Sequence, residues 1–416
     1  MPARRLAARW VLPVATPPIE RGAVLLGRDG RIEAVGPDAL IPRPAGVPSE
    51  AFPDAVLIPG LVNAHTHLEL TGFDLGAPPE PDFRSWIGRV RRVKETRSTD
   101  AFLACARLGL TECWAGGVTT VGDTGDSGSV IKALAELGGS GIAYQEVFGP
   151  HPSQAPESLA GLQQRVDELG RWEGGRVRIG VSPHAPYTVS GPLYAAVAGW
   201  ARTEGLPLAV HLAESPAESA LLLDGKGPFA DTWRERDIPL PAGPGCSPVE
   251  WAERHGVLGE RTLCIHVVQA ADADLARLAR GAVAVAHCPL SNAAHRHGTA
   301  PLRNFLAHGL RVGLGTDSPL SVGTPDLLAE ARAARHLAAL EPDSALALAT
   351  LGGARALALD REIGSLEPGK WGDCVVIRPR FPADGPAEQV LEAGREDVVA
   401  TFLGGRAVYR ADPVRT

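Results

Sequence analysis

The chain has 416 residues, of which 44% are hydrophobic and 21% charged, and this composition is typical of an ordinary globular protein. Its formal net charge of −7 argues against a nucleic-acid-binding protein, and no apolar run approaches the roughly 20 residues of a membrane span. The six cysteines form no C-x-x-C pair, and the stretch that follows the basic Arg4 and Arg5 is too short and broken for the apolar core of a secretory signal, so we expect a cytoplasmic protein.

Apolar, strand-like runs recur through the middle of the chain and alternate with helical stretches. The predicted strands lie at about residues 55–65, 117–124, 141–148, 176–184, 206–212, 261–267, 281–287 and 310–317. The predicted helices lie at about 102–114, 161–172, 192–204, 271–280, 325–340 and 344–357. Eight strands that alternate with helices predict a (β/α)8 TIM-like barrel of the α/β class.

The two ends of the chain differ from its middle. Residues 1–56 and 366–416 contain short β-like pieces separated by turn signals. We predict that both termini come together as one small composite β-domain, and that residues 57–365 form the barrel. The glycine- and proline-rich segment 222–247 follows the fifth predicted strand and is either a lid or a solvated connection.

Side chains that can bind metal stand at the ends of several predicted strands. His65 and His67 end the first strand, and because alternate side chains of a strand share a face, both can hold one ion. His211 closes the fifth strand and Asp317 the eighth. Polar residues at successive strand ends meet at one rim of a parallel barrel. Three imidazoles and one carboxylate therefore predict a divalent metal ion that lowers the pKa of a bound water to about 7.

Two further side chains are predicted to act at the same rim. Glu214 lies three residues after His211, where it can take a proton from the water and return it to a leaving group. The alternative for Glu214 is a carboxylate in the first turn of a helix. His266 ends the sixth strand and is placed to hydrogen-bond the nucleophile or to polarise the attacked ring. The predicted catalytic residues are Glu214, His266 and Asp317.

With these residues in place, the chain resembles the amidohydrolase superfamily over nearly its whole length. It looks most like the branch that holds cytosine, guanine and S-adenosylhomocysteine deaminases and triazine chlorohydrolases. The matching segments are 59–67, 116–123, 184–187, 287–292, 315–318 and 364–373. The resemblance implies hydrolytic deamination of a heteroaromatic ring with Zn²⁺ or Fe²⁺, usually in a homodimer.

One metal ion is expected, not two. Two-metal relatives of such barrels commonly bridge their ions with a carboxylated lysine at the fourth strand end. That position reads Ser182-Pro183-His184, and the four lysines of the chain lie elsewhere. His295 and His297 repeat the H-x-H spacing, but they follow a probable loop with no strand before it, so we do not expect them to bind metal.

Within this branch, the segments 289–292 and 315–321 look similar to those of aminodeoxyfutalosine deaminases. Those enzymes convert an adenosine derivative that bears a benzoate group into futalosine, on a route to menaquinone. Glu69 departs from the methylthioadenosine and S-adenosylhomocysteine deaminases, which tend to carry an apolar residue there. The predicted substrate-binding residues are His184, Tyr187, Asn292, Glu69 and Arg84.

Several alternatives stay open at this point. Arg84, Arg89 or Arg296 could receive a substrate carboxylate, although each also fits an ordinary surface role. The substrate could instead be S-adenosylhomocysteine, adenosine or guanine. A triazine-type chlorohydrolase would release chloride, but a glutamate suits an amine leaving group because ammonia must be protonated to leave. A non-catalytic scaffold of this fold would be expected to lose metal ligands, and this chain has every one.

Overall fold

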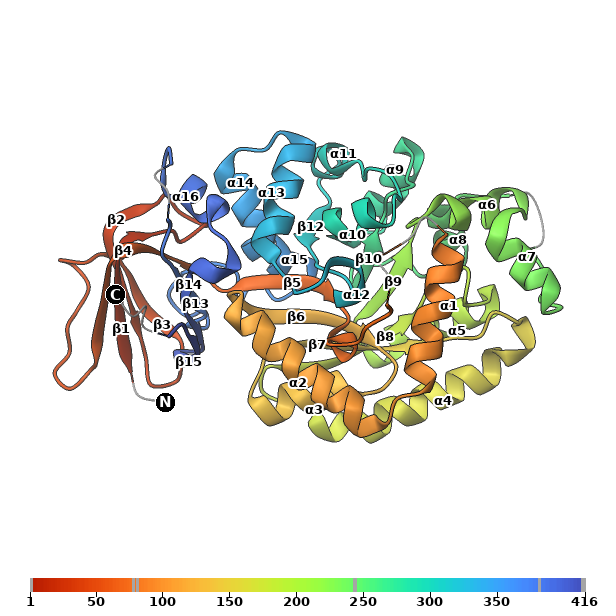
Figure 1. Cartoon of the computed structure of the whole chain (residues 1–416), viewed down its shortest axis with the longest axis horizontal. Helices are drawn as coiled ribbons and strands as arrows, with labels where there is room; N and C mark the ends of the chain where they lie inside the picture. Colours follow the sequence, from red (N-terminus) through yellow and green to blue (C-terminus); the bar gives the residue numbers. More distant parts are fainter. Residues whose placement is uncertain (1–2, 77–78, 80–81, 242–244, 381–382, 413–416) are drawn as a thin grey trace. The chain divides into compact units, whose positions relative to one another are not determined.

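The computed structural model describes residues 3–76, 79, 82–241, 245–380 and 383–412 (Figure 1). The chain divides into two compact units. Unit 1 comprises residues 1–64, 110–121 and 324–416, and unit 2 comprises residues 65–109 and 122–323. Within the described residues, no helix is both long enough and apolar enough to cross a membrane.

A seven-stranded sheet is built from both ends of the chain. Its strand order is β15-β14-β13-β4-β1-β2-β3. The strands are β1 (Arg4–Val11), β2 (Ile19–Leu26), β3 (Ile32–Pro37), β4 (Ser49–Pro59), β13 (Cys374–Ile377), β14 (Val398–Leu403) and β15 (Arg406–Arg410). The C-terminal β13 pairs antiparallel with the N-terminal β4, and Leu6, Val24, Leu57, Val376 and Phe402 pack in its core. The predicted separate sheet formed by the two termini is confirmed.

The second sheet has eight strands and forms a nearly closed parallel barrel, as predicted. Its strands follow one another in sequence order from β5 to β12. They are β5 (Leu61–Thr66), β6 (Val118–Gly125), β7 (Gly141–Val147), β8 (Val177–Pro183), β9 (Leu208–Leu212), β10 (Thr262–His266), β11 (Ala284–His287) and β12 (Arg311–Leu314). A parallel bridge between Thr66 and Asp317 joins the ends of the first and last strands. Nearly every strand residue is buried, as expected for a parallel sheet covered on both faces.

The predicted first strand, 55–65, is interrupted at Gly60. The chain leaves β4 at Pro59 and enters β5 at Leu61, so one apolar run supplies two strands in two sheets. The N–H of Gly60 donates to the carbonyl of Asp373, whereas the N–H of Leu61 donates to the carbonyl of Gly117. A Cβ atom at Gly60 would lie 2.1 Å from Oγ1 of Thr119, so only glycine fits this crossing.

Helices follow most of the barrel strands. They are α1 (Phe83–Glu95), α2 (Thr99–Ala115), α3 (Ser129–Leu137), α4 (Ala155–Leu169), α5 (Gly191–Glu204), α6 (Pro216–Asp224), α7 (Gly227–Glu235), α8 (Pro248–Arg254), α9 (Asp272–Arg280), α10 (Pro289–Ala294), α11 (Leu302–Ala307), α12 (Pro319–Val322), α13 (Leu327–Ala338), α14 (Pro342–Ala347), α15 (Gly353–Ala356) and α16 (Pro386–Glu392). The predicted helix 344–357 is divided into α14, a π-helical turn at Leu348–Gly352, and α15. The segment 222–247 contains the end of α6 and all of α7, while residues 242–244 lie outside the described residues.

Candidate metal centre and catalytic site

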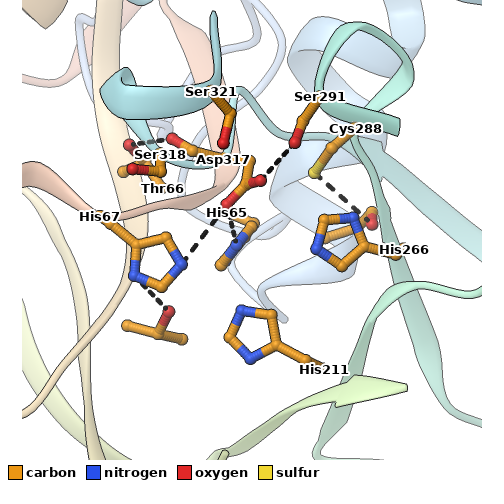
Figure 2. A network of polar contacts seen from close by, with 12 residues as sticks. His65, Thr66, His67, His211, His266, Cys288, Ser291, Asp317, Ser318 and Ser321 are labelled. Atoms are coloured by element: carbon orange, nitrogen blue, oxygen red, sulfur yellow. Dashed lines mark hydrogen bonds and ion pairs between the residues drawn. The ribbon is translucent and has the colours of Figure 1, made fainter. Parts of the chain in front are cut away.

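Five of the predicted site residues converge at the carboxyl end of the barrel, all within unit 2 (Figure 2). His65 lies in β5, His67 follows it, and His211 lies in β9. His266 is the last residue of β10, and Asp317 follows β12. Apart from the partly exposed His67, all of these side chains are buried. Polar groups that converge in a buried place point to a ligand or to catalysis.

Among these five residues the donor atoms form two overlapping groups, and His211 also belongs to a third group with Glu146 and His184. One nitrogen from each of His65, His67 and His211 lies within 4.8 Å of the others, and the same limit holds for His65, His266 and Asp317. Oδ1 of Asp317 lies 3.2 Å from Nε2 of His65 and 3.4 Å from Nε2 of His67. His65 therefore belongs to both groups.

Hydrogen bonds behind the rings fix their orientation. Nδ1 of His211 lies 3.2 Å from the carbonyl oxygen of His184, and because a carbonyl can only accept, this nitrogen carries the proton. The lone pair of a neutral His211 is then on Nε2. Nδ1 of His266 similarly donates to Oδ1 of Asn292 at 2.9 Å. Such outer contacts are typical of histidines that bind metal or act in catalysis, because they select the tautomer.

The backbone at three of these strand ends is unusual. His266, Asp317 and Ala213, the neighbour of Glu214, have φ angles of +70°, +57° and +52°, a region that residues other than glycine rarely adopt. Non-glycine residues in this conformation cost about 1–3 kcal/mol and cluster at functional sites. The unusual backbone at these strand ends is therefore associated with side chains that point toward the same place.

The protonation of the donors fits a divalent cation. Burial lowers the pKa of His65 to about 3 and that of His211 well below its usual value, so both rings are neutral. Burial opposes ionisation of Asp317, but hydrogen bonds from His65 and His67 outweigh it and hold its pKa well below the usual range. Neutral imidazoles and an ionised carboxylate are the donors that zinc and iron take.

His67 has the opposite shift. Burial favours its neutral form, yet the hydrogen bond to Asp317 and the charges of Glu146, Asp317 and Asp123 together raise its pKa to about 9. Its Nδ1 lies 3.3 Å from the hydroxyl of Thr124, which leaves Nε2 directed at Asp317. A cation bound here would compete with this proton, because metal ligands must be deprotonated.

Glu214 lies beside this cluster, two residues after β9, and is buried. The hydroxyl of Tyr187 donates to Oε2 of Glu214 at 3.3 Å. Oε1 faces two imidazoles, and it lies 3.6 Å from Nε2 of His266 and 3.6 Å from Nδ1 of His297. Because Tyr187 occupies Oε2, Oε1 is the oxygen that can exchange a proton at the site.

Burial and nearby negative charges favour the protonated form of Glu214. Burial raises its pKa well above the usual value, and the negative charges of Asp317 and Glu218 add to the shift. A carboxyl group whose pKa is raised holds an accepted proton more readily and can pass it on, which is the property of a general acid–base. The geometry is therefore compatible with the predicted proton shuttle.

Glu218 was not foreseen from the sequence. It is fully buried in α6, and its carboxylate accepts the backbone N–H groups of Ala213 and Glu214, each at 2.8 Å. The hydroxyl of Ser215 accepts the N–H of Glu218 and begins the helix. The Ser-x-x-Glu pattern 215–218 is a capping signal visible in the sequence, but it does not show that this carboxylate holds the backbone of the shuttle residue.

Replacing Glu218 with alanine is expected to lower kcat about 10-fold or more while metal content is unchanged, because Glu214 loses the contacts that hold its backbone. Ammonia release measured over a range of substrate concentrations would give kcat and KM separately. Glu250 is the matched control, since Ser247-Pro248-Val249-Glu250 begins α8 with the same spacing. Glu250→Ala should leave kcat near the wild-type value. Glu218→Gln should recover part of the loss, and equal kcat losses in Glu218→Ala and Glu250→Ala would contradict a positioning role.

Three predicted substrate-binding residues lie next to the cluster. The ring of His184 is 4.8 Å from that of His211, between centroids, and its Nδ1 lies 2.8 Å from the hydroxyl of Thr188. Tyr187 contacts Glu214, and Asn292 contacts His266. The structure thus places Tyr187 and Asn292 against predicted catalytic residues.

Glu69 and Arg84 are engaged elsewhere. The carboxylate of Glu69 accepts Nζ of Lys94 at 2.7 Å and the backbone N–H of Ser127 at 3.2 Å. Arg84 lies on α1, is 40% exposed, and donates to Glu235 at 2.9 Å. The structure does not bring either residue into the group around Asp317. Their predicted contacts with substrate stay predictions.

Comparison with known proteins adds independent findings. The model of the amidohydrolase family matches residues 56–408. A 5-methylthioadenosine/S-adenosylhomocysteine deaminase from Moorella thermoacetica is 31% identical, over 98% of this chain and 94% of that protein. An aminodeoxyfutalosine deaminase from Deinococcus radiodurans is 36% identical, over 72% of this chain and 73% of that protein.

A solved structure has the same fold. The zinc-bound adenosine deaminase from Xanthomonas campestris superposes with a TM-score of 0.83 at 26% identity. The match covers 97% of this chain and 92% of that one. It agrees with the predicted barrel and with the separate sheet built from the two termini.

Proposed function

Because the chain belongs to the amidohydrolase family, we propose that it is a metal-dependent hydrolytic deaminase of an adenosine-like nucleoside. The family match and the deaminases among its relatives confirm the predicted class, a hydrolase that removes an amino group. The observation that carries the proposed metal-dependent hydrolysis is the overlapping cluster of His65, His67, His211, His266 and Asp317 beside the buried Glu214. The nucleoside is supported by the deaminases among the relatives.

His65, His67, His211 and Asp317 are the proposed ligands of one ion. A divalent ion held there would supply a Lewis acid that activates a water at neutral pH. Zinc is the first choice, because the Xanthomonas campestris deaminase carries it, and ferrous iron is the alternative. Ser291 donates to Oδ2 of Asp317 and so keeps its Oδ1 turned toward His65 and His67.

Glu214 moves the protons of the proposed reaction. Water adds to the carbon that bears the amino group, Oε1 of Glu214 takes one of its protons, and the ring nitrogen next to that carbon receives it. The second proton of the water then leaves with the amine as ammonia. Nε2 of His266 is an acceptor because its Nδ1 donates to Asn292, so it can orient the water by accepting a hydrogen bond.

The proposed substrate is 6-amino-6-deoxyfutalosine, which would give futalosine and ammonia. The 36% identity to the Deinococcus radiodurans aminodeoxyfutalosine deaminase supports it. The second candidate is 5-methylthioadenosine or S-adenosylhomocysteine, which is favoured by the longer match to the Moorella thermoacetica enzyme. A place in menaquinone synthesis, a homodimer and a cytoplasmic location also stay proposals.

Adenosine is expected to be a poor substrate compared with the carboxylated nucleoside. A site that binds a substituent strongly rejects analogues that lack it, because its own polar groups are then left unpaired. Ammonia release from aminodeoxyfutalosine, S-adenosylhomocysteine, 5-methylthioadenosine, adenosine and guanine would be compared as kcat/KM. Equal or faster turnover of adenosine or guanine would contradict the specific substrate and leave the deaminase class standing. Chloride release from a chlorotriazine, without ammonia release from any nucleoside, would instead indicate a chlorohydrolase.

A further inference from the structure

His297 lies in a turn after α10 that the backbone holds firmly. Its N–H donates to the carbonyl of Asn292 at 2.9 Å, and its carbonyl accepts the side-chain amide of Gln269. Its neighbours Arg296 and Gly298 have φ angles of +56° and +108°. The ring of His297 is therefore fixed by the turn, and its side chain is only 3% exposed.

The ring of His297 packs as an aromatic side chain but keeps two polar atoms. Its centroid lies 4.5 Å from that of Phe83, edge to face, and 5.2 Å from that of His295. Neither ring nitrogen of His297 has a hydrogen-bond partner among the residues that the structure describes. A phenyl ring would fill the same space without burying unpaired polar atoms, which lower stability. Packing alone therefore does not account for an imidazole here.

One of these unpaired nitrogens, Nδ1, faces the predicted proton shuttle. Nδ1 of His297 lies 3.6 Å from Oε1 of Glu214, and that oxygen is the same distance from Nε2 of His266. Burial lowers the pKa of His297 to about 3, so its ring is neutral and offers one N–H donor and one lone pair. A planar ring that receives a proton from Glu214 comes within reach of this donor.

We propose that His297 contacts the substrate and donates a hydrogen bond to an acceptor nitrogen of its purine, so that it selects which heteroaromatic rings are deaminated. This inference rests on the proposed nucleoside deaminase activity. The neighbouring His295 differs, because its Nε2 is 2.9 Å from the hydroxyl of Ser321 and so has a protein partner. His297 is not proposed as a metal ligand.

The test compares His297→Phe with His295→Phe, two buried histidines that pack against Phe83. His297→Phe should lower kcat/KM for the nucleoside at least about 10-fold, with unchanged metal content and an equal or higher Tm. His295→Phe should lower the Tm, because it removes a buried hydrogen bond, and change kcat/KM much less. Near-normal kcat/KM in His297→Phe, or equal kcat/KM losses in the two variants, would overturn the proposal.

Ring analogues provide a second readout. If His297 donates to a purine nitrogen, either the 3-deaza or the 7-deaza nucleoside should be a poorer substrate for the wild-type enzyme, and His297→Phe should remove that difference. An unchanged difference in the variant, or no difference in the wild type, would overturn the contact. Calorimetry of purine riboside binding distinguishes a failure of this contact from a failure of the proposed function. If the wild type deaminates no nucleoside, a 10-fold weaker affinity in His297→Phe would still support the contact, and equal affinities or no binding would refute it.

Discussion

Replacing His67 with alanine is expected to remove the bound metal ion and to lower turnover below detection while the fold is kept. Nε2 of His67 lies 3.4 Å from Oδ1 of Asp317, and its ring stacks 5.4 Å from that of His211. The substitution removes the ring of His67 and, with it, one of the four proposed ligands. Without the ion, the pKa of the water is no longer lowered to about 7, so the nucleophile is lost at neutral pH.

Elemental analysis of the purified variant, circular dichroism and ammonia release would check this result together. Added zinc should raise the Tm of the wild type, because an ion that binds only the folded state stabilises it, and should not raise that of His67→Ala. His308→Ala is the control, since His308 is exposed and its Nδ1 bonds the carbonyl of Asn304, four residues earlier. One tightly bound ion in active His67→Ala would contradict the ligand assignment. Two ions per wild-type chain would contradict the single-ion proposal.

The arrangement of strands was predictable because their signals are local. Each barrel strand is a short apolar run, and His65, His211 and His266 stand at the ends of such runs. In a parallel barrel these ends meet at one rim, so the order along the chain predicts proximity in space. The break at Gly60 was missed because the apolar run continues across it, and only the approach of Thr119 shows why glycine is needed.

Other features of the site depend on contacts that the sequence does not display. In the sequence, Glu218 has the pattern of an ordinary capping residue. Its hydrogen bond with the backbone N–H of Glu214 forms where Ala213 has a positive φ, which the sequence does not display. No strand precedes His297 in the sequence, so nothing there shows that its ring faces Glu214. Its direction comes from the turn after α10 and from its packing on Phe83. The pairing of Arg84 with Glu235 is also not visible in the sequence, and its contact with a substrate carboxylate stays a prediction.

Replacing Glu214 with glutamine is expected to lower kcat by about 100-fold or more without a change in metal content. Glutamine has nearly the same shape and can still accept the hydrogen bond from Tyr187, so the site should keep its geometry. It cannot take a proton at the position of Oε1, which faces His266 and His297. The loss should therefore appear in kcat rather than in KM, because binding of the ring is kept and proton transfer is not.

Steady-state ammonia release would measure both constants, with Glu253→Gln, a partly exposed glutamate on α8, as the control. A solvent deuterium isotope effect would add evidence, since it should be larger in Glu214→Gln if proton transfer has become rate-limiting. Near-normal kcat in Glu214→Gln would mean that another group moves the protons, and His266 would be the next candidate. Loss of the metal ion in this variant would instead indicate that Glu214 is a metal ligand. That outcome requires the carboxylate to turn from Tyr187 toward His65 and His211, which the hydrogen bonds from Glu218 to the adjoining backbone oppose.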